Sequence, residues 1–231
     1  MENNSLSFGE DQTIAKQNAF ITNVYGLMTG ALGITGVIAW YVSSNENVLL
    51  QLAPYFKMLL IGEFLVVMGL VWLLNRVSVN MARALFVLYS VMNGLTFGVI
   101  FSLFTGESIA STFFVTGGTF GVMSLYGYYT KTDLTKIGKI LIMALIGIVI
   151  ASLVNLFLGS EMIYWITTYV GVLIFVGLIA YDTQKLKAMA INVTNSGDEV
   201  EHKASIMGAL TLYLDFINLF LLLLRILGRR R

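Results

Sequence analysis

Four ionisable residues interrupt the long apolar runs of this sequence: Glu63, Asp182, Asp215 and Arg225. Carboxylates and a guanidinium can hold protons, attract ions or pair with one another. Because an ionisable side chain is costly in a nonpolar environment, it usually faces other protein groups or a water-filled path there. Each of the four residues is therefore a candidate functional residue.

Asp182 and Asp215 are placed so that they could act as a pair. Asp182 lies near the C-terminal end of one apolar segment. The next apolar segment begins at Ser205, and Asp215 lies ten residues further along it. At ~1.5 Å per helical residue, their depths differ by about two turns. Two facing carboxyl groups in a low-dielectric interior can share a proton, which makes a proton sensor. When deprotonated, the same oxygens are hard ligands suited to Ca²⁺.

The last apolar segment carries a stripe of polar and small residues at helical spacing. Intervals of three, four, three and seven place its members on one helix face: Gly208, Thr211, Asp215, Asn218 and Arg225. Such a stripe indicates a helix that faces a protein interior or a water-filled path. Thr211 and Asn218 could complete part of a calcium shell. The structural alternative is that these groups join helices by hydrogen bonds.

The composition shows which elements must position these residues. Only 12% of the 231 residues are charged and 57% are hydrophobic, whereas a soluble domain carries roughly 25% charged residues. The apolar runs lack the alternation of membrane β-barrels, so we predict an all-α protein with seven membrane-spanning helices. A short polar tail, predicted to be cytosolic, covers residues 1–19, and a single domain covers residues 20–231. The predicted spans are residues 20–42, 56–74, 84–104, 109–129, 137–158, 162–181 with a helical continuation to 187, and 205–227.

Glycines four residues apart within these spans indicate close helix packing, because they let helix backbones approach. We assign them no chemical role. The pairs are Gly26 and Gly30, Gly94 and Gly98, and Gly117 and Gly121.

Basic residues predict the orientation, since short cytoplasmic loops accumulate lysine and arginine. If the N-terminus lies inside, Lys57 is the only basic residue in the predicted outer loops. Seven crossings then place the C-terminus outside, so the arginines from Arg225 to Arg231 depart from the rule. A re-entrant last segment would remove this conflict, but its length favours a full crossing. In this orientation Glu63 and Arg225 share the outer half, which predicts a salt bridge between them.

Structural roles are the alternatives for several charged residues. Asp182 could form an ion pair with Lys185 at the helix end. Arg76 and Arg83 lie at inner helix ends, where a long basic side chain extends to the interface; one of them could also reach Asp182. His202, in the polar connection over residues 192–203, is predicted to be solvated.

Composition also excludes several function classes. There is no cysteine, and His202 is the single histidine, which excludes thiolate chemistry and makes a Ser-His-Asp triad implausible. The net charge of +1 offers no surface for nucleic acid. We expect no cofactor, with calcium as a ligand or transported ion, and the lipid bilayer as the main partner.

Two stretches resemble the signature of the Bax-inhibitor family of transmembrane proteins, specifically its bacterial inner-membrane members: FVGLIAYDTQKLK and SIMGALTLYLDFINLFLLLLRILG. The resemblance implies six helices around a central seventh, and a calcium leak regulated by pH. It places the family's paired aspartates at Asp182 and Asp215, an acidic residue at Glu63 and an arginine at Arg225. Arg76 is the nearest candidate for the family's arginine at the inner end of the second helix.

Two other functions compete with a leak channel. Resemblance to bacterial members suggests a regulator or substrate of a membrane-anchored ATP-dependent protease, with residues 1–19 as its handle. An intramembrane aspartyl protease would use a Tyr-Asp pair, which Tyr181 and Asp182 match. Its second aspartate should follow Gly-x-Gly, whereas Asp215 stands in LYLD, and no Pro-Ala-Leu element is present. We therefore expect no enzymatic activity.

Overall fold

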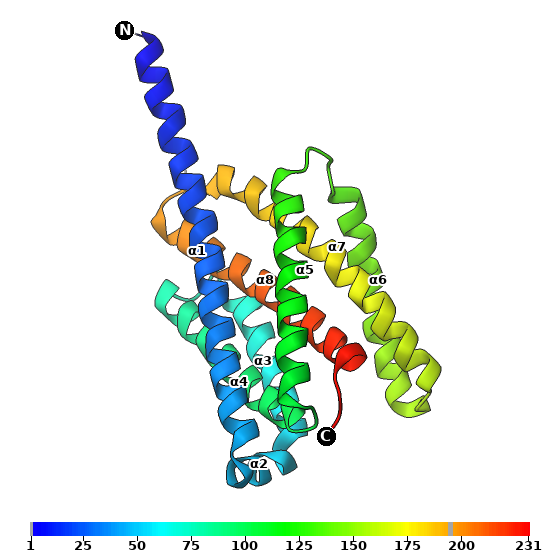
Figure 1. Cartoon of the computed structure of the whole chain (residues 1–231). Helices are drawn as coiled ribbons and strands as arrows, with labels where there is room; N and C mark the ends of the chain where they lie inside the picture. The colour runs from blue at the N-terminus through cyan, green and yellow to red at the C-terminus, as the bar shows by residue number, and fades with distance from the viewer. Residues whose placement is uncertain (1, 194–195) are drawn as a thin grey trace. The chain divides into compact units, whose positions relative to one another are not determined.

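The computed structural model describes residues 2–193 and 196–231, with side chains described from residue 15 onward. These residues form helices and no strand, which confirms the all-α prediction (Figure 1). Seven helical segments in the described residues are long and apolar enough to cross a membrane. The elements are α1 (Glu2–Ser44), α2 (Glu46–Leu52), the 3-10 helix η1 (Ala53–Tyr55), α3 (Phe56–Leu73), α4 (Val79–Phe101), α5 (Gly106–Tyr129), α6 (Thr135–Leu158), α7 (Glu161–Val193) and α8 (Asp198–Leu227).

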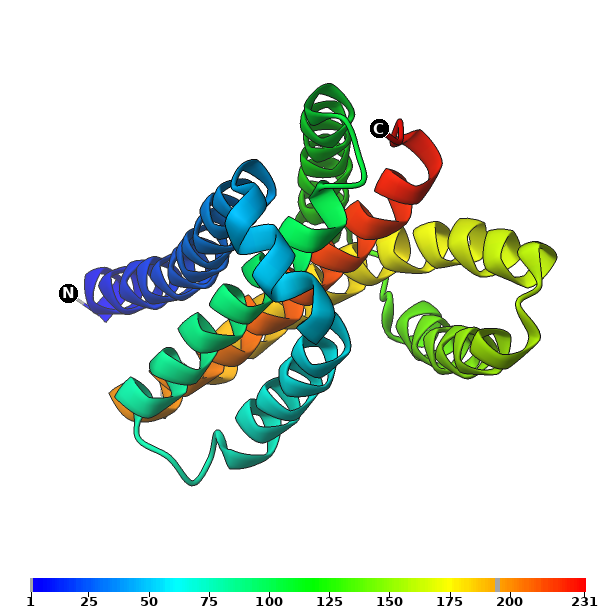
Figure 2. The ribbon, with the colours of Figure 1, turned by 90° about the horizontal axis from the view of Figure 1, so that it is seen from below.

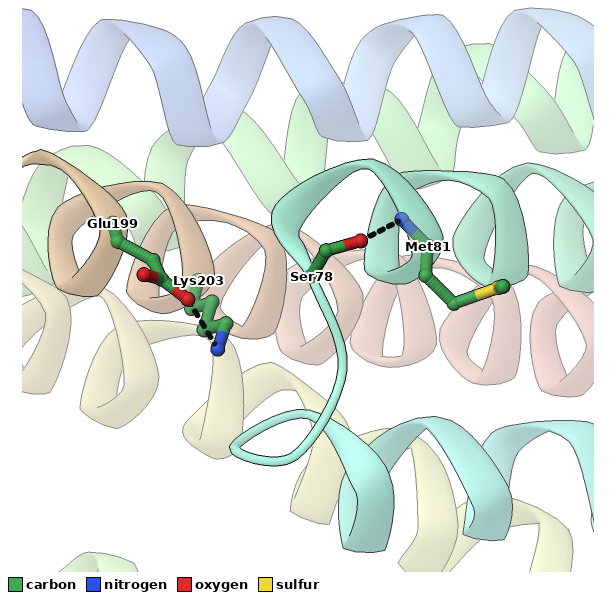
Figure 3. A network of polar contacts seen from close by, with 4 residues as sticks. All are labelled: Ser78, Met81, Glu199 and Lys203. Atoms are coloured by element: carbon green, nitrogen blue, oxygen red, sulfur yellow. Dashed lines mark hydrogen bonds and ion pairs between the residues drawn. The ribbon is translucent and has the colours of Figure 1, made fainter.

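The polar connection predicted over residues 192–203 is shorter than expected. Helix α7 continues to Val193 and α8 begins at Asp198, so His202 lies on a helix rather than in a loop. Acidic residues in the first turn of α8 favour this start, because they offset the positive end of the helix dipole. Lys203 also forms a salt bridge of 2.8 Å with Glu199 one turn away (Figure 3). Residues 194 and 195 lie outside the described residues.

The chain divides into two compact units, and the first comprises residues 1–103 and 186–213. Helix α4 packs along α1 and also along α3, with which it forms a hairpin (Figure 2). A side chain at Gly94 or Gly98 would collide with Ile38 or Val42, so this glycine pair allows the close approach of α1 and α4 that its spacing predicts. The pairs at residues 26 and 30 and at 117 and 121 face open space instead.

The hairpin between α3 and α4 turns at a capped helix start. The hydroxyl of Ser78 accepts a hydrogen bond of 3.3 Å from the main-chain N–H of Met81 (Figure 3). This bond satisfies one of the free N–H groups at the first turn of α4. The cap therefore defines where α4 begins after the loop that contains Arg76, whose side chain is exposed.

The second unit comprises residues 104–185 and 214–231. Gly127 of α5 lies against the main chain of Ala180 on α7, and Gly138 of α6 lies against the ring of Tyr181. Helices α6 and α7 form a hairpin whose turn contains Gly159, with a left-handed φ of 62° (Figure 2). The glycine contacts hold α5 and α6 against α7 at Ala180 and Tyr181, directly before Asp182.

The spans differ in burial. Of the seven, α8 is the most buried and α6 the least. A helix buried on most sides must satisfy its polar groups within the protein. The predicted arrangement of six helices around α8 agrees with its burial and stays a prediction.

Candidate functional site

Asp182 of α7 and Asp215 of α8 lie together in the second unit. Their exposed fractions are 9% and 5%, and a hydrogen bond joins their carboxyl groups. The structure thus brings together the two aspartates that the spacing predicted to face each other. A carboxylate can only accept hydrogen bonds, so this contact requires a proton on one of the two groups.

One carboxyl oxygen of the pair has no hydrogen-bond partner among the described residues. This oxygen is the buried Oδ2 atom of Asp215. An unpaired buried acceptor is costly, and such atoms are expected where a proton, water or cation is exchanged. The contact between the two carboxyl groups therefore leaves one buried acceptor oxygen that no other described residue uses.

Aromatic side chains pack beside the pair along α8. Phe216, which follows Asp215, has its ring centroid 5.6 Å from that of Phe113 and 5.6 Å from that of Phe120, both on α5. Apolar walls raise the energetic cost of charge on a nearby carboxylate. Sharing one proton reduces that cost, since the pair then carries one negative charge instead of two.

Lys185 is the nearest basic residue along α7. It is exposed and interacts electrostatically with Asp182, one turn away. In the described part of the chain, however, no salt bridge joins the two side chains. The hydrogen bond of Asp182 goes to Asp215, which makes the carboxyl pair, rather than a helix-end ion pair, the main feature of this site.

Thr211 and Asn218 form hydrogen bonds within α8 itself. The Thr211 hydroxyl donates to the carbonyl of Met207 at 3.0 Å, and the Asn218 amide donates to the carbonyl of Leu214 at 2.8 Å. These bonds do not join helices, in contrast to the structural alternative for the stripe. Both side chains keep oxygen lone pairs as acceptors. Thr211 belongs to the first unit and Asn218 to the second.

Glu63 and Arg225 each have a partner within their own unit. Glu63 of α3 accepts a hydrogen bond from the hydroxyl of Thr96 on α4. The guanidinium carbon of Arg225 lies 5.4 Å from the centre of the Tyr164 ring, a cation–π distance. Because Glu63 and Arg225 belong to different units, the predicted salt bridge between them stays a prediction.

Sequence reasoning missed a polar contact around Tyr213, two residues before Asp215. The hydroxyl of Thr35 donates to the carbonyl of Ser90 at 2.8 Å, so the Tyr213 hydroxyl, 2.7 Å from Thr35 Oγ1, must be the donor in the second bond. The rings of Phe86 and Tyr89 contact that of Tyr213 edge-on. Tyr213 lies off the polar stripe, but a tyrosine this deep in an apolar run signals a buried hydroxyl partner.

The described residues contain no group of three or more histidine, cysteine, aspartate or glutamate side chains that could hold a metal ion. Asp182 and Asp215 can supply two carboxylates. The remaining ligands of a calcium ion would have to come from carbonyl groups, amide oxygens or water.

The fold and the site define a multi-pass helical membrane protein with a buried carboxyl pair between two of its spans. The sequence profile of the family described as "Inhibitor of apoptosis-promoting Bax1" matches residues 17–231. The chain belongs to this Bax inhibitor family, as its two signature stretches indicated.

Similar proteins occur in several bacteria. The inner membrane protein YbhL of Escherichia coli strain K12 is 50% identical over 224 residues, which covers 95% of each chain. An uncharacterised protein of Borreliella burgdorferi is 44% identical and covers 96% of this chain and 97% of its own length. Another, from Rickettsia prowazekii, is 43% identical over 92% of this chain and 90% of its own.

Proposed function

We propose that this protein is a pH-sensitive calcium leak channel of the inner membrane, gated by a proton shared between Asp182 and Asp215. The observation that carries the proposal is the buried, hydrogen-bonded carboxyl pair. The name of the Escherichia coli relative supports the membrane assignment. In the proposed orientation the N-terminus is cytosolic and the C-terminus lies outside.

The gate follows from the two protonation states of the pair. With one shared proton, the carboxyl groups attract each other through a hydrogen bond and hold α7 and α8 together at this level. Without the proton, both groups are carboxylates that repel each other and attract a divalent cation. Loss of the proton therefore both breaks the contact and creates a site for Ca²⁺.

A site with only two carboxylates favours passage of a calcium ion over tight binding. Ca²⁺ takes six to eight oxygen ligands, and tight sites supply several carboxylates. The described residues offer the Asp182 and Asp215 pair, with Asn218 one turn further along α8 as an uncharged oxygen donor. Water would complete the shell, so the ion would bind weakly enough to leave.

The test is calcium flux into liposomes that contain only the purified protein, measured across pH. Wild-type flux should rise with pH, because a higher pH removes the shared proton. Asp215→Asn keeps the size and a hydrogen bond but removes one ionisable group, so its pH profile should be flat. The matched control is Asp133→Asn, which changes an exposed loop carboxylate and should keep the wild-type profile. An Asp215→Asn protein with the wild-type profile would refute the proposal.

A further inference from the structure

A cavity of about 320 Å³ lies in the second unit, where α6, α7 and the C-terminal half of α8 face one another. Its volume falls at the lower end of the range for small-ligand sites, about 300–1,000 Å³. The lining is mostly apolar, and its polar side chains are Ser152 of α6 and Asn218 and Arg225 of α8. The apolar walls include Leu153 and Leu156 of α6, Phe175 of α7 and Leu222 of α8.

The packing of α6 explains why the cavity exists. Gly138 and Leu141 bring the first half of α6 close to α7, at Tyr181 and Gly177. Beyond Leu141 the side chains of α6 are largely exposed, and those of Leu153 and Leu156 are 55% and 78% exposed. The second half of α6 therefore leaves apolar space beside α7 and α8, next to where the acyl chains of a bilayer would lie.

The charge at the cavity indicates what would occupy it. Arg225 alone among the lining residues is charged, and no described carboxylate forms a salt bridge with it. Its guanidinium would repel Ca²⁺ but can donate two parallel hydrogen bonds to a phosphate group. A mostly apolar cavity whose lining includes one guanidinium fits a molecule with an acyl chain and an anionic headgroup.

The C-terminal residues add positive charge at the same end of α8. Arg229, Arg230 and Arg231 are exposed and follow within six residues of Arg225. The main chain holds them in place in the second unit: the N–H of Thr105 donates to the carbonyl of Arg229 at 2.9 Å, and Phe104 forms a β-bridge with Arg230. Basic clusters at a membrane surface attract anionic lipid headgroups. Lipid binding would also give a role to arginines that depart from the orientation rule.

We propose that this cavity binds an anionic phospholipid, with one acyl chain between α6, α7 and α8 and its phosphate group on the Arg225 guanidinium. Asn218 reaches the cavity one turn after Asp215, but the site does not depend on calcium transport. Lipid binding and the calcium leak can therefore fail independently.

Native mass spectrometry of the full chain tests the proposal by counting retained lipids after exchange into defined mixtures. The wild type should retain phosphatidylglycerol in preference to phosphatidylcholine. Arg225→Gln should weaken phosphatidylglycerol retention by about tenfold, the loss of a charged hydrogen-bonded contact. Lys139→Gln, which removes an exposed positive charge near the start of α6 and outside the lining, should change it by less than about twofold.

A second pair of variants tests the acyl-chain part of the site. Leu153→Trp fills the cavity and should reduce retention, whereas Ile150→Trp places the same ring on an exposed position of α6 outside the lining. This pair keeps the test valid if Arg225→Gln fails to fold. Equal loss in Arg225→Gln and Lys139→Gln would overturn the proposal in favour of general surface attraction. Unchanged retention in Leu153→Trp would overturn it as well.

Discussion

Tyr213 and Asp215, two residues apart on α8, illustrate two ways of placing a polar group in a membrane protein. Tyr213, in the first unit, is fully buried and its hydroxyl is satisfied by Thr35. Asp215, in the second unit, is also buried, but its contact depends on a proton and leaves one oxygen unpaired. A neutral, satisfied contact stabilises the helix at any physiological pH. A carboxyl pair adds a contact that pH can remove, which suits regulation better than stability.

The largest expected effect is the loss of the pH response of calcium flux when either aspartate of the carboxyl pair is replaced. Asp182→Asn and Asp215→Asn should each abolish the pH response of calcium flux, because a single remaining carboxyl group has no partner with which to share a proton. The double variant should be little worse than either single one, since residues that act together are not additive. The measurement is liposome flux across pH for all three variants. Additive losses would show that the two aspartates act separately.

Substitution of Tyr213 tests the neutral contact. Tyr213→Ala should cost about 3 kcal/mol of stability through lost packing, and Tyr213→Phe about 1 kcal/mol through one lost hydrogen bond. Neither cost should depend on pH, because the contact contains no ionisable group that titrates near neutrality. Thermal unfolding in detergent at two pH values measures both. A pH-dependent cost would contradict the comparison between the two residues.

Glu63 is an intermediate case, an ionisable group bonded to a neutral hydroxyl. Because the Thr96 hydroxyl donates to Glu63, Glu63→Leu and Thr96→Val should show a coupling energy above about 0.5 kcal/mol in a double-mutant cycle. The stabilities of the two single variants and the double variant give this value. Strict additivity would show that the bond between Thr96 and Glu63 adds nothing measurable to stability.

The smallest effect on stability is expected at Asp133, an exposed carboxylate that serves as a comparison for the buried ones. Hydrogen bonds from Thr135 lower the pKa of Asp133 below its ordinary value. A lowered folded-state pKa stabilises the protein above the ordinary pKa, and this stabilisation is lost as pH falls through the lowered value. Thr135→Val should therefore reduce thermal stability slightly at neutral pH and less in acid. A larger effect in acid than at neutral pH would contradict this sign.

The features that follow from helix periodicity could be predicted from the sequence. The spans, the polar stripe and the proximity of Asp182 and Asp215 depend on spacing along two consecutive helices. The contact between Tyr213 and Thr35 could not be predicted, because it joins residues 178 positions apart. The helical start of α8 was missed for a different reason: its charged residues suggested a loop, whereas acidic residues in a first turn also stabilise a helix.

The main-chain contacts of Arg229 and Arg230 also matter for protein engineering. Because both residues are tied to the start of α5, a fusion partner attached after Arg231 would begin one residue beyond a β-bridge. A bulky domain joined without a spacer would strain that attachment. Affinity tags and fluorescent reporters at this end therefore need a flexible linker, rich in glycine and serine, to leave the main-chain contacts of Arg229 and Arg230 undisturbed.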